Sequence, residues 1–216
     1  MTAIAAAEKM DRQYRFQRHI YDATRTHYLL WRRRLIKELA PQRGGSVVEI
    51  ACGTGWNLVR AARRYPQARF YGLDISAEML RTATAAVQKN SLQGRVKLAQ
   101  GDATNFDLKA TFQLAGADRI FISYALSMIP DWPRAIENAV RALNPGGALF
   151  IVDFGRMERL PHAPRWAFRR FLKHYNVTPR HDLEGVAREA ARRHGMHMRF
   201  EESRRGYSAY VVLMKD

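Results

Sequence analysis

The chain has 216 residues and a hydrophobic content of 47%, which provides a buried core and excludes a disordered chain. Lysine and arginine total 36 against 20 aspartate and glutamate, and the formal net charge of +16 favours polyanions such as nucleic acid or an anionic membrane. The single cysteine excludes a disulfide framework, and no apolar run approaches the roughly 20 residues that cross a bilayer. We read no secretory signal, so we expect a soluble or peripheral protein.

The first predicted element covers residues 8–40, which we expect to form one or two helices that end at Pro41. Tyr14, Tyr21 and Tyr28 recur every seven residues, close to two helical turns, so they form one stripe on a helix. Two interpretations stay open. The stripe either packs the helix onto the core, or it covers a ligand cleft as a lid whose aromatic faces stabilise a cation.

From residue 46 onward, short β-branched runs alternate with helical segments. We expect strands within 46–51, 69–76, 95–103, 117–129 and 146–155, and helices within 56–65, 77–90 and 132–143. Ser76 is a predicted N-cap, with Glu78 in the first turn of its helix. Strands that alternate with helices predict a mostly parallel sheet covered on both faces.

The C-terminal part differs in composition. Residues 156–181 are rich in arginine, proline, histidine and aromatic side chains, and no regular element is predicted there. Residues 183–195 predict a helix that ends near a glycine. Two closing runs, 196–203 and 207–216, predict an antiparallel hairpin at the sheet edge.

These elements predict one α/β domain over residues 1–216, with a Rossmann-like, doubly wound and mostly parallel sheet. We expect an N-terminal helical lid or membrane-facing segment over 1–43, a cofactor-binding core over 44–155, and a basic substrate-side segment with a helix and closing strands over 156–216. The oligomeric state stays open.

A nucleotide site is predicted where "VVEIACGTGWN" (47–57) passes from a strand through a glycine loop into a helix. Gly53 and Gly55 allow positive φ and a close approach of backbone to ligand. Asp74 ends the second strand, where a carboxylate accepts hydrogen bonds from both ribose hydroxyls. Asp102 ends the third strand, where it can receive an adenine amino group.

The loop does not match the common nucleotide fingerprints. A dinucleotide site would read G-x-G-x-x-G, whereas Ala51 precedes Gly53 and Gly55 here, and no Walker lysine follows the loop. Glu49 stands just before the loop. A carboxylate there disfavours a pyrophosphate and suits a cationic amino-acid group.

The motifs "VVEIACGTG", "YGLDIS", "QGDA" and "LNPGGALFIVDF" resemble those of the class I S-adenosylmethionine-dependent methyltransferases over roughly residues 46–155. Alanine at position 51, where the family usually has glycine, is a mild departure. The resemblance implies S-adenosyl-L-methionine as cofactor and S-adenosyl-L-homocysteine as product. An alternative is a doubly wound domain that binds no cofactor. We assign to the cofactor site Tyr21, Glu49, Ala51, Gly53, Gly55, Asn57, Asp74, Ile75, Met79, Asp102, Ala103 and Ser123.

The stretch "MDRQYRFQRHIYDATRTHYLLWRRRLI" (10–36), with "IACGTGWNL" and "ALSMIPDW", resembles the bacterial betaine-lipid N-methyltransferases, which are similar to the bacterial phosphatidylethanolamine N-methyltransferases. The implied reaction methylates the amino group of diacylglycerylhomoserine three times to give diacylglyceryl-trimethylhomoserine. "WRRRL" (31–35) and "RWAFRRFLKHY" (165–175) interleave arginine with aromatic residues, as a peripheral enzyme on an anionic membrane requires. We expect the inner face of the cytoplasmic membrane and no nucleic acid. A solvated helix face with core aromatics is the alternative.

Methyl transfer to an amine is an in-line displacement by a neutral nitrogen lone pair. The protein must align the two groups, exclude water and pass on the proton that the ammonium loses. We predict no metal site. Candidates for orienting the amine or moving its proton are Tyr14, His19, Tyr21, Ser123 and Tyr124, and candidates for the acceptor or the membrane are Tyr28, Arg156, Arg159, Arg165 and Arg169.

Competing functions remain at this point. The acceptor is a lipid headgroup, or the chain methylates RNA or another small molecule, or it is a non-catalytic adaptor. The basic charge allows RNA, but "SYALSMIP" stands where a base-methylating enzyme would carry an Asn-Pro-Pro-Tyr-type motif.

Overall fold

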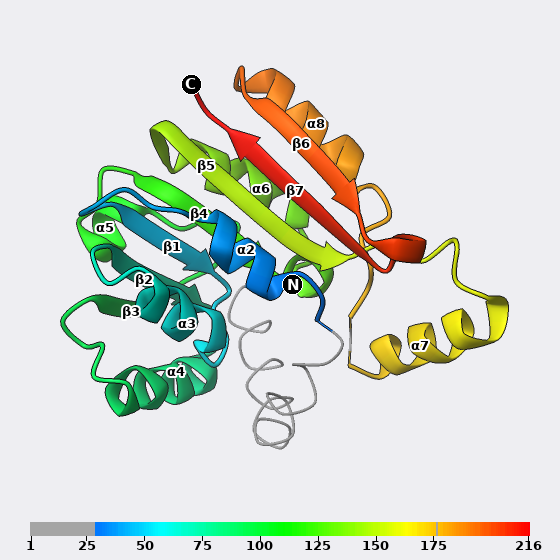
Figure 1. The fold of residues 1–216 in the computed structure, drawn as a ribbon, viewed down its shortest axis with the longest axis horizontal. Helices are drawn as coiled ribbons and strands as arrows, with labels where there is room; N and C mark the ends of the chain where they lie inside the picture. Colours follow the sequence, from blue (N-terminus) through cyan, green and yellow to red (C-terminus); the bar gives the residue numbers. More distant parts are fainter. Residues whose placement is uncertain (1–28, 176) are drawn as a thin grey trace.

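The computed structural model describes residues 29–175 and 177–216, whose strands form one sheet in the order β3-β2-β1-β4-β5-β7-β6 (Figure 1). β1 to β5 are mutually parallel, and β7 runs antiparallel to both β5 and β6. The strands are β1 Ser46–Ile50, β2 Arg69–Asp74, β3 Val96–Gln100, β4 Ala117–Ser123, β5 Leu143–Phe154, β6 His197–Glu202 and β7 Ser208–Met214.

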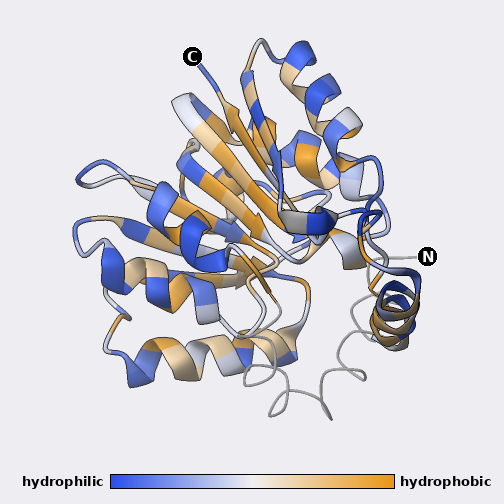
Figure 2. Cartoon of the chain, turned by 45° about the vertical axis from the view of Figure 1, so that its right-hand side comes forward, coloured by the Kyte–Doolittle hydropathy of each residue, from blue (hydrophilic) through white to orange (hydrophobic). Residues whose placement is uncertain are grey.

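Helices cover both faces of the sheet. The described helices are α2 Arg32–Glu38, α3 Trp56–Arg64, α4 Ala77–Lys89, α5 Leu108–Phe112, α6 Trp132–Arg141, α7 His162–His174 and α8 Leu183–Arg193. Alternate β1 side chains enter two separate cores. Val47 packs with α2, α3 and α4, and Val48 packs with α5, α6 and α8. Figure 2 shows the most hydrophobic residues along the central strands, between these layers. The predicted doubly wound sheet is therefore confirmed.

The predicted closing hairpin is also confirmed, and its two strands have different environments. β7, "SAYVVLM", is buried along nearly its whole length, whereas β6, "HMRFEE", has no fully buried residue. The apolar strand takes the inner position beside β5 because it can bury both faces, and the more polar strand takes the edge.

The region 156–181 contains a helix that the sequence analysis did not predict. α7 spans His162–His174, in the stretch for which the sequence analysis gives only a composition. Pro161 precedes the helix and Pro164 lies in its first turn, where a missing N–H breaks no intrahelical hydrogen bond. Figure 1 shows α7 beside the sheet rather than on either face.

The N-terminal segment is described only from residue 29. α2 is its described helix, and it packs on the sheet face through Leu35 and Ile36 rather than over an open cleft. The predicted lid or membrane-facing segment over 1–43 and the division into segments stay predictions, and residues 1–28 lie outside the described part of the chain. No described helix is long and apolar enough to cross a bilayer.

Candidate functional site

The carboxyl ends of β1, β2 and β3 bring the three predicted cofactor acids to one edge of the sheet. Glu49 is the penultimate residue of β1, Asp74 is the last of β2, and Asp102 follows β3 closely. These strands are parallel neighbours, so their carboxyl ends lie side by side. This is the edge of an open α/β sheet where nucleotides bind.

The loop after β1 leaves room for a ligand. Gly53 and Gly55 have φ of 55° and 75°, and a Cβ on Gly53 would meet no atom within 4 Å. A Cβ on Gly55 would lie 3.1 Å from the Ala83 Cβ, so glycine allows α3 to pack closely on α4. Ala51 also has a positive φ of 54°, a conformation that costs a non-glycine residue about 1–2 kcal/mol. The departure from the family glycine is thus less mild than the sequence indicated.

Asp74 and Asp102 are held in place by backbone donors. Asp74 is buried and accepts hydrogen bonds from Gly53 N at 2.7 Å and Ser76 N at 2.9 Å. Oδ1 of Asp102 accepts from both N and Oγ1 of Thr104 at 2.8 Å. These contacts orient both carboxylates, and a carboxylate oxygen can accept about two hydrogen bonds, which suits ligand hydroxyl or amino groups.

The remaining predicted cofactor residues surround the same strand ends. Ile75 is half-buried, and its carbonyl accepts from Gln100 Nε2 at 2.9 Å, which ties β2 to β3. Met79 and Ala103 are buried. Ser76 caps α4 by accepting from Met79 N at 3.2 Å, as predicted.

Glu49 is the most unusual group of this edge. It is 1% exposed, and its Oε1 accepts from Asn57 Nδ2 at 2.7 Å, while Oε2 is buried without a hydrogen-bond partner in the described part of the chain. Asn57 Oδ1 in turn accepts from Arg32 Nε at 2.8 Å, and the Arg32 guanidinium stacks 3.8 Å from the Trp56 ring centroid. Burial raises the pKa of Glu49 to about 8, although Asn57 and Arg32 oppose this.

These features fit S-adenosylmethionine. A buried carboxylate oxygen that lacks a donor suits the ammonium of the methionine part, and Asp74 and Asp102 suit the ribose and the adenine. When bound, the cofactor supplies a methyl group on a positively charged sulfur.

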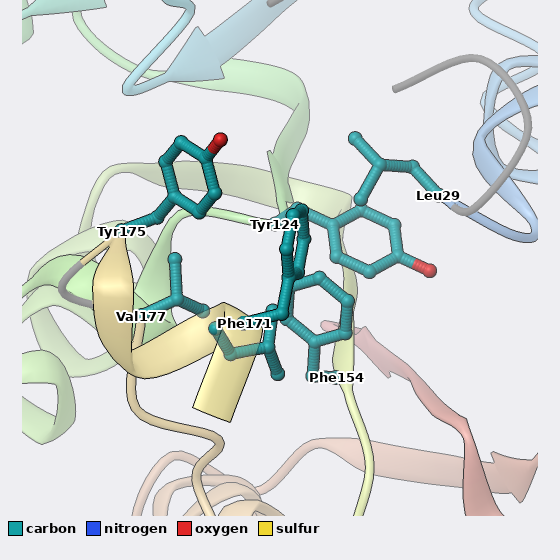
Figure 3. A pocket seen from close by; sticks show the side chains of 7 residues that line it. Leu29, Tyr124, Phe154, Phe171, Tyr175 and Val177 are labelled. Carbon is teal, nitrogen blue, oxygen red and sulfur yellow. The ribbon is translucent and has the colours of Figure 1, made fainter. Parts of the chain in front are cut away.

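A second feature lies at the carboxyl ends of β4 and β5. Tyr124 follows β4 and Phe154 ends β5, and both line a small cavity that opens to solvent. Figure 3 shows the side chains that surround it. The ring centroids of Tyr124 and Phe154 lie 4.8 Å apart, and those of Phe171 and Tyr175 lie 4.9 Å apart. Among the described residues, the lining consists of Leu29, Tyr124, Phe154, Phe171, Leu172, Tyr175 and Val177. We call this the aromatic cavity.

The catalytic predictions have different outcomes. Ser123 ends β4, and its Oγ is buried without a partner among the described residues. The Tyr124 hydroxyl donates to Leu30 O at 2.8 Å and pairs with Ser208 Oγ at 2.8 Å. Burial also raises the Tyr124 pKa far above its ordinary value. Tyr124 therefore contributes its ring to the cavity, and its hydroxyl is not placed to take a proton. Lying outside the described residues are Tyr14, His19, Tyr21 and Tyr28.

The predicted acceptor arginines lie beside the aromatic cavity and do not line it. Arg156 Nε donates to His181 O at 2.8 Å, and Arg169 donates to Arg156 O at 3.2 Å. Arg165 donates to Glu158 O at 3.3 Å. These contacts shape the segment around α7.

Sequence reasoning missed several residues of this edge. The basic run 31–35 predicts a membrane-facing Arg32, but Arg32 is buried beneath the cofactor loop. Asp153 is fully buried and accepts a hydrogen bond from Phe154 N at 2.7 Å, and burial raises its pKa to about 6. An acid at the carboxyl end of a strand was the signal that could have found it. No three His, Cys, Asp or Glu side chains of the described residues could hold a metal ion.

Comparison with known proteins identifies relatives. Residues 47–147 match the family described as "Methyltransferase domain". The demethylmenaquinone methyltransferase of Listeria welshimeri is 29% identical over 140 residues, which are 64% of this chain and 56% of the relative. The 2-phytyl-1,4-naphtoquinone methyltransferase of Nostoc punctiforme is 29% identical over 164 residues, which are 75% of this chain and 68% of the relative. The chain thus spans about half the length of the Listeria relative.

Solved structures share the fold. A SAM-dependent methyltransferase from Aquifex aeolicus has a TM-score of 0.65 and 19% identity, and the match covers 100% of both chains. A phosphoethanolamine N-methyltransferase of Haemonchus contortus in complex with S-adenosyl-L-methionine has a TM-score of 0.67 and 18% identity, over 85% of this chain and 52% of that one. At these identities the likeness shows the fold alone. Together with the family match over residues 47–147 and the cofactor edge, this likeness supports S-adenosylmethionine as the cofactor and methyl transfer as the reaction.

Proposed function

We propose that the chain methylates the amino group of a membrane-resident amphiphile, and that the acceptor is a lipid headgroup amine of the diacylglycerylhomoserine class. The observation that carries the proposal is the aromatic cavity. It lies at the carboxyl ends of β4 and β5, and β4 pairs with β1, whose carboxyl end carries the cofactor loop. A donor on the loop and an acceptor in the cavity would therefore meet near Ser123.

The lining of the cavity suits an amine that becomes a methylated ammonium. Tyr124, Phe154, Phe171 and Tyr175 present aromatic rings, and no charged side chain of residues 29–175 and 177–216 belongs to the lining. Aromatic faces attract a cation with up to about 2 kcal/mol when water is excluded, and this attraction does not require N–H donors on the cation. Such a lining accommodates each successive methylation product.

The mechanism assigned to the chain is mainly alignment. Glu49 would hold the methionine ammonium of the cofactor, Asp74 the ribose and Asp102 the adenine, and the bound cofactor would supply the methyl group. The Ser123 Oγ, buried and unpartnered among the described residues, would accept a hydrogen bond from an N–H of the acceptor amine and so orient its lone pair, and the proton that the methylated nitrogen loses would pass to solvent at the open side of the cavity. The apolar lining excludes water from the reacting nitrogen.

The names of the curated relatives support a second candidate better than a lipid amine. They are demethylmenaquinone and phytyl-naphtoquinone methyltransferases, which indicates a small-molecule acceptor with a quinone ring. A planar ring would stack on the same aromatic side chains. The two candidates share the cofactor edge and differ in the atom that receives the methyl group.

One assay separates the candidates. The purified chain is incubated with methyl-labelled S-adenosylmethionine and, in detergent, diacylglycerylhomoserine lipid, phosphatidylethanolamine, demethylmenaquinone or transfer RNA. We expect label in diacylglycerylhomoserine, with label in phosphatidylethanolamine indicating a broader amine specificity. Label in the quinone alone would establish the second candidate, and label in RNA alone would overturn both.

A substitution in the cavity tests its role. Tyr175 is half-buried, so Tyr175→Leu removes a ring without opening the core. We expect about a tenfold loss of kcat/KM for an amine acceptor, equivalent to about 1.4 kcal/mol of lost cation stabilisation. Tyr175→Phe keeps the ring and is expected to retain activity. Equal activity of the leucine and phenylalanine variants would contradict the role of the ring.

A further inference from the structure

α7 has two chemically different faces. Phe168 and Leu172 face the molecule, because Leu172 is 2% exposed and the Phe168 ring lies 5.9 Å from that of Phe154 and 5.2 Å from that of Tyr207. Trp166, Arg169 and Arg170 follow one another at helical spacing on the other side, and all three are exposed. The helix is therefore amphipathic, and its outer face combines one indole with guanidinium groups.

The outer side of α7 exposes more apolar surface than a solvated helix needs. Trp166 is 61% exposed and Phe171 is 41% exposed, and they are two of the four large hydrophobic residues recorded as exposed in the described chain. The Arg170 Cζ lies 5.9 Å from the Trp166 ring centroid. Exposed aromatic side chains beside cations indicate an interaction site, because their apolar surface has no packing partner in water.

The charge of this region has one sign. Residues 156–181 contain seven arginines or lysines and a single acid, Glu158, and α7 itself contains no acid. Within the described residues, no acidic side chain forms an ion pair with Arg169 or Arg170. Their charge is available to an anionic partner.

Phe171 connects this surface with the aromatic cavity. It lines the cavity together with Tyr175, stacks 5.9 Å from Phe168, and remains partly open to solvent (Figure 3). A molecule held at the outer side of α7 would thus reach the cavity past Phe171. The surface and the acceptor cavity are parts of one route.

We infer that α7 is an interfacial helix that docks the enzyme on an anionic lipid bilayer, with Trp166 in the headgroup zone and Arg169 and Arg170 on lipid phosphates. Phe171 then marks the entrance by which a lipid headgroup passes into the cavity. Docking on an interface needs exposed apolar side chains, here Trp166 and Phe171, beside basic residues, and each basic residue near an anionic surface contributes about 1 kcal/mol. The inference rests on the proposed function and adds the docking surface to it.

Vesicle flotation tests the docking surface. The full chain is mixed at physiological salt with vesicles of phosphatidylcholine alone, or of phosphatidylcholine with phosphatidylglycerol. We expect binding to the anionic vesicles, and at least about tenfold weaker binding for Arg169→Glu/Arg170→Glu. Arg169→Lys/Arg170→Lys keeps the charge and is expected to bind. Thermal unfolding and S-adenosylhomocysteine binding verify that each variant is folded.

A matched control separates local docking from diffuse charge. Arg43 and Arg69 are exposed at the amino ends of β1 and β2, on the sheet edge opposite the cavity. Arg43→Glu/Arg69→Glu makes the same change in net charge and is expected to keep most of the binding. Equal losses in the two double variants would overturn the inference, as would unchanged binding of the α7 variant.

Two further readouts complete the test. We expect a blue shift of tryptophan fluorescence on anionic vesicles that Trp166→Phe abolishes, and no shift in the wild-type chain would contradict insertion. If RNA binds through Arg169 and Arg170 and the vesicles do not bind, the partner of α7 is RNA and the membrane inference is overturned. Activity on a detergent-solubilised acceptor tests the proposed function separately. If that activity persists without vesicle binding, only the docking inference fails.

Discussion

At the residue scale, Glu49 is a buried carboxyl group that a bound cation would stabilise in its charged form. Its carboxyl is buried, one oxygen has no donor in the described part of the chain, and its pKa is raised to about 8 chiefly by burial. Between pH 4.5 and 8 the folded chain therefore holds a proton on Glu49 that the unfolded chain has released. Stability of the ligand-free protein falls as the pH rises through this window.

Glu49→Gln should remove that part of the pH dependence, because an amide does not titrate. Asp153, with a pKa raised to about 6, contributes mostly below pH 6.5, so urea unfolding at pH 6.5 and pH 8 isolates Glu49. We expect the free energy of unfolding of the wild type to fall by about 1–2 kcal/mol more than that of the variant. The same slope in both proteins would show that Glu49 is ionised in the folded chain.

At the element scale, α2 is fastened to the C-terminal hairpin. The Arg34 guanidinium donates to both carboxylate oxygens of Glu201 in β6, at 2.7 and 2.6 Å, and to Glu38 at 2.7 Å. Its Cζ lies 4.8 Å from the Tyr210 ring centroid in β7. These contacts hold the N-terminal helix on the same sheet face as the cofactor-side helices, and they also hold Arg32 in position.

A double-mutant cycle of Arg34→Ala and Glu201→Ala measures this link. The pair is bidentate and half-exposed, so we expect a coupling energy of about 0.5–1.5 kcal/mol in urea unfolding, reduced in 1 M salt. The exposed Arg188–Glu184 pair within α8 is the reference, with about 0.3–0.5 kcal/mol expected. A coupling no larger than the reference would mean that apolar packing alone fastens α2.

At the scale of the whole molecule, the strand order places donor and acceptor side by side. β1 lies between β2 and β4, so the cofactor acids and the aromatic cavity are on adjoining parts of one sheet edge. Ligand binding to this edge contacts the ends of several strands at once. It should therefore stabilise the molecule as a unit.

S-adenosylhomocysteine should raise the melting temperature accordingly. At about 100 times its Kd, a ligand that binds only the folded chain adds about 2.7 kcal/mol, which is about 5–10 °C for a domain of this size. Differential scanning calorimetry of the wild type and Glu49→Gln measures it, with a clearly smaller shift expected for the variant. Equal shifts would remove Glu49 from the ligand site.

The sequence by itself determined the features whose signals are local. The alternation of strands and helices, the glycine loop after β1, Asp74 at the end of β2 and the Ser76 cap all follow from neighbouring residues and a regular period. The cofactor class followed from the same motifs, because parallel strands bring their carboxyl ends together. The sequence analysis assigned no element to α7, since proline in the first turn of a helix resembles proline in a loop.

The tertiary structure alone decided what depends on distant residues meeting. The aromatic cavity combines Leu29, Tyr124, Phe154 and Phe171 from four separate segments, and no periodic pattern joins them. The burial of an arginine or the occupation of a tyrosine hydroxyl likewise depends on which chain segment packs against it. Long-range packing sets solvent exposure, and solvent exposure sets whether a charge or an aromatic ring serves the core, a ligand or a partner surface.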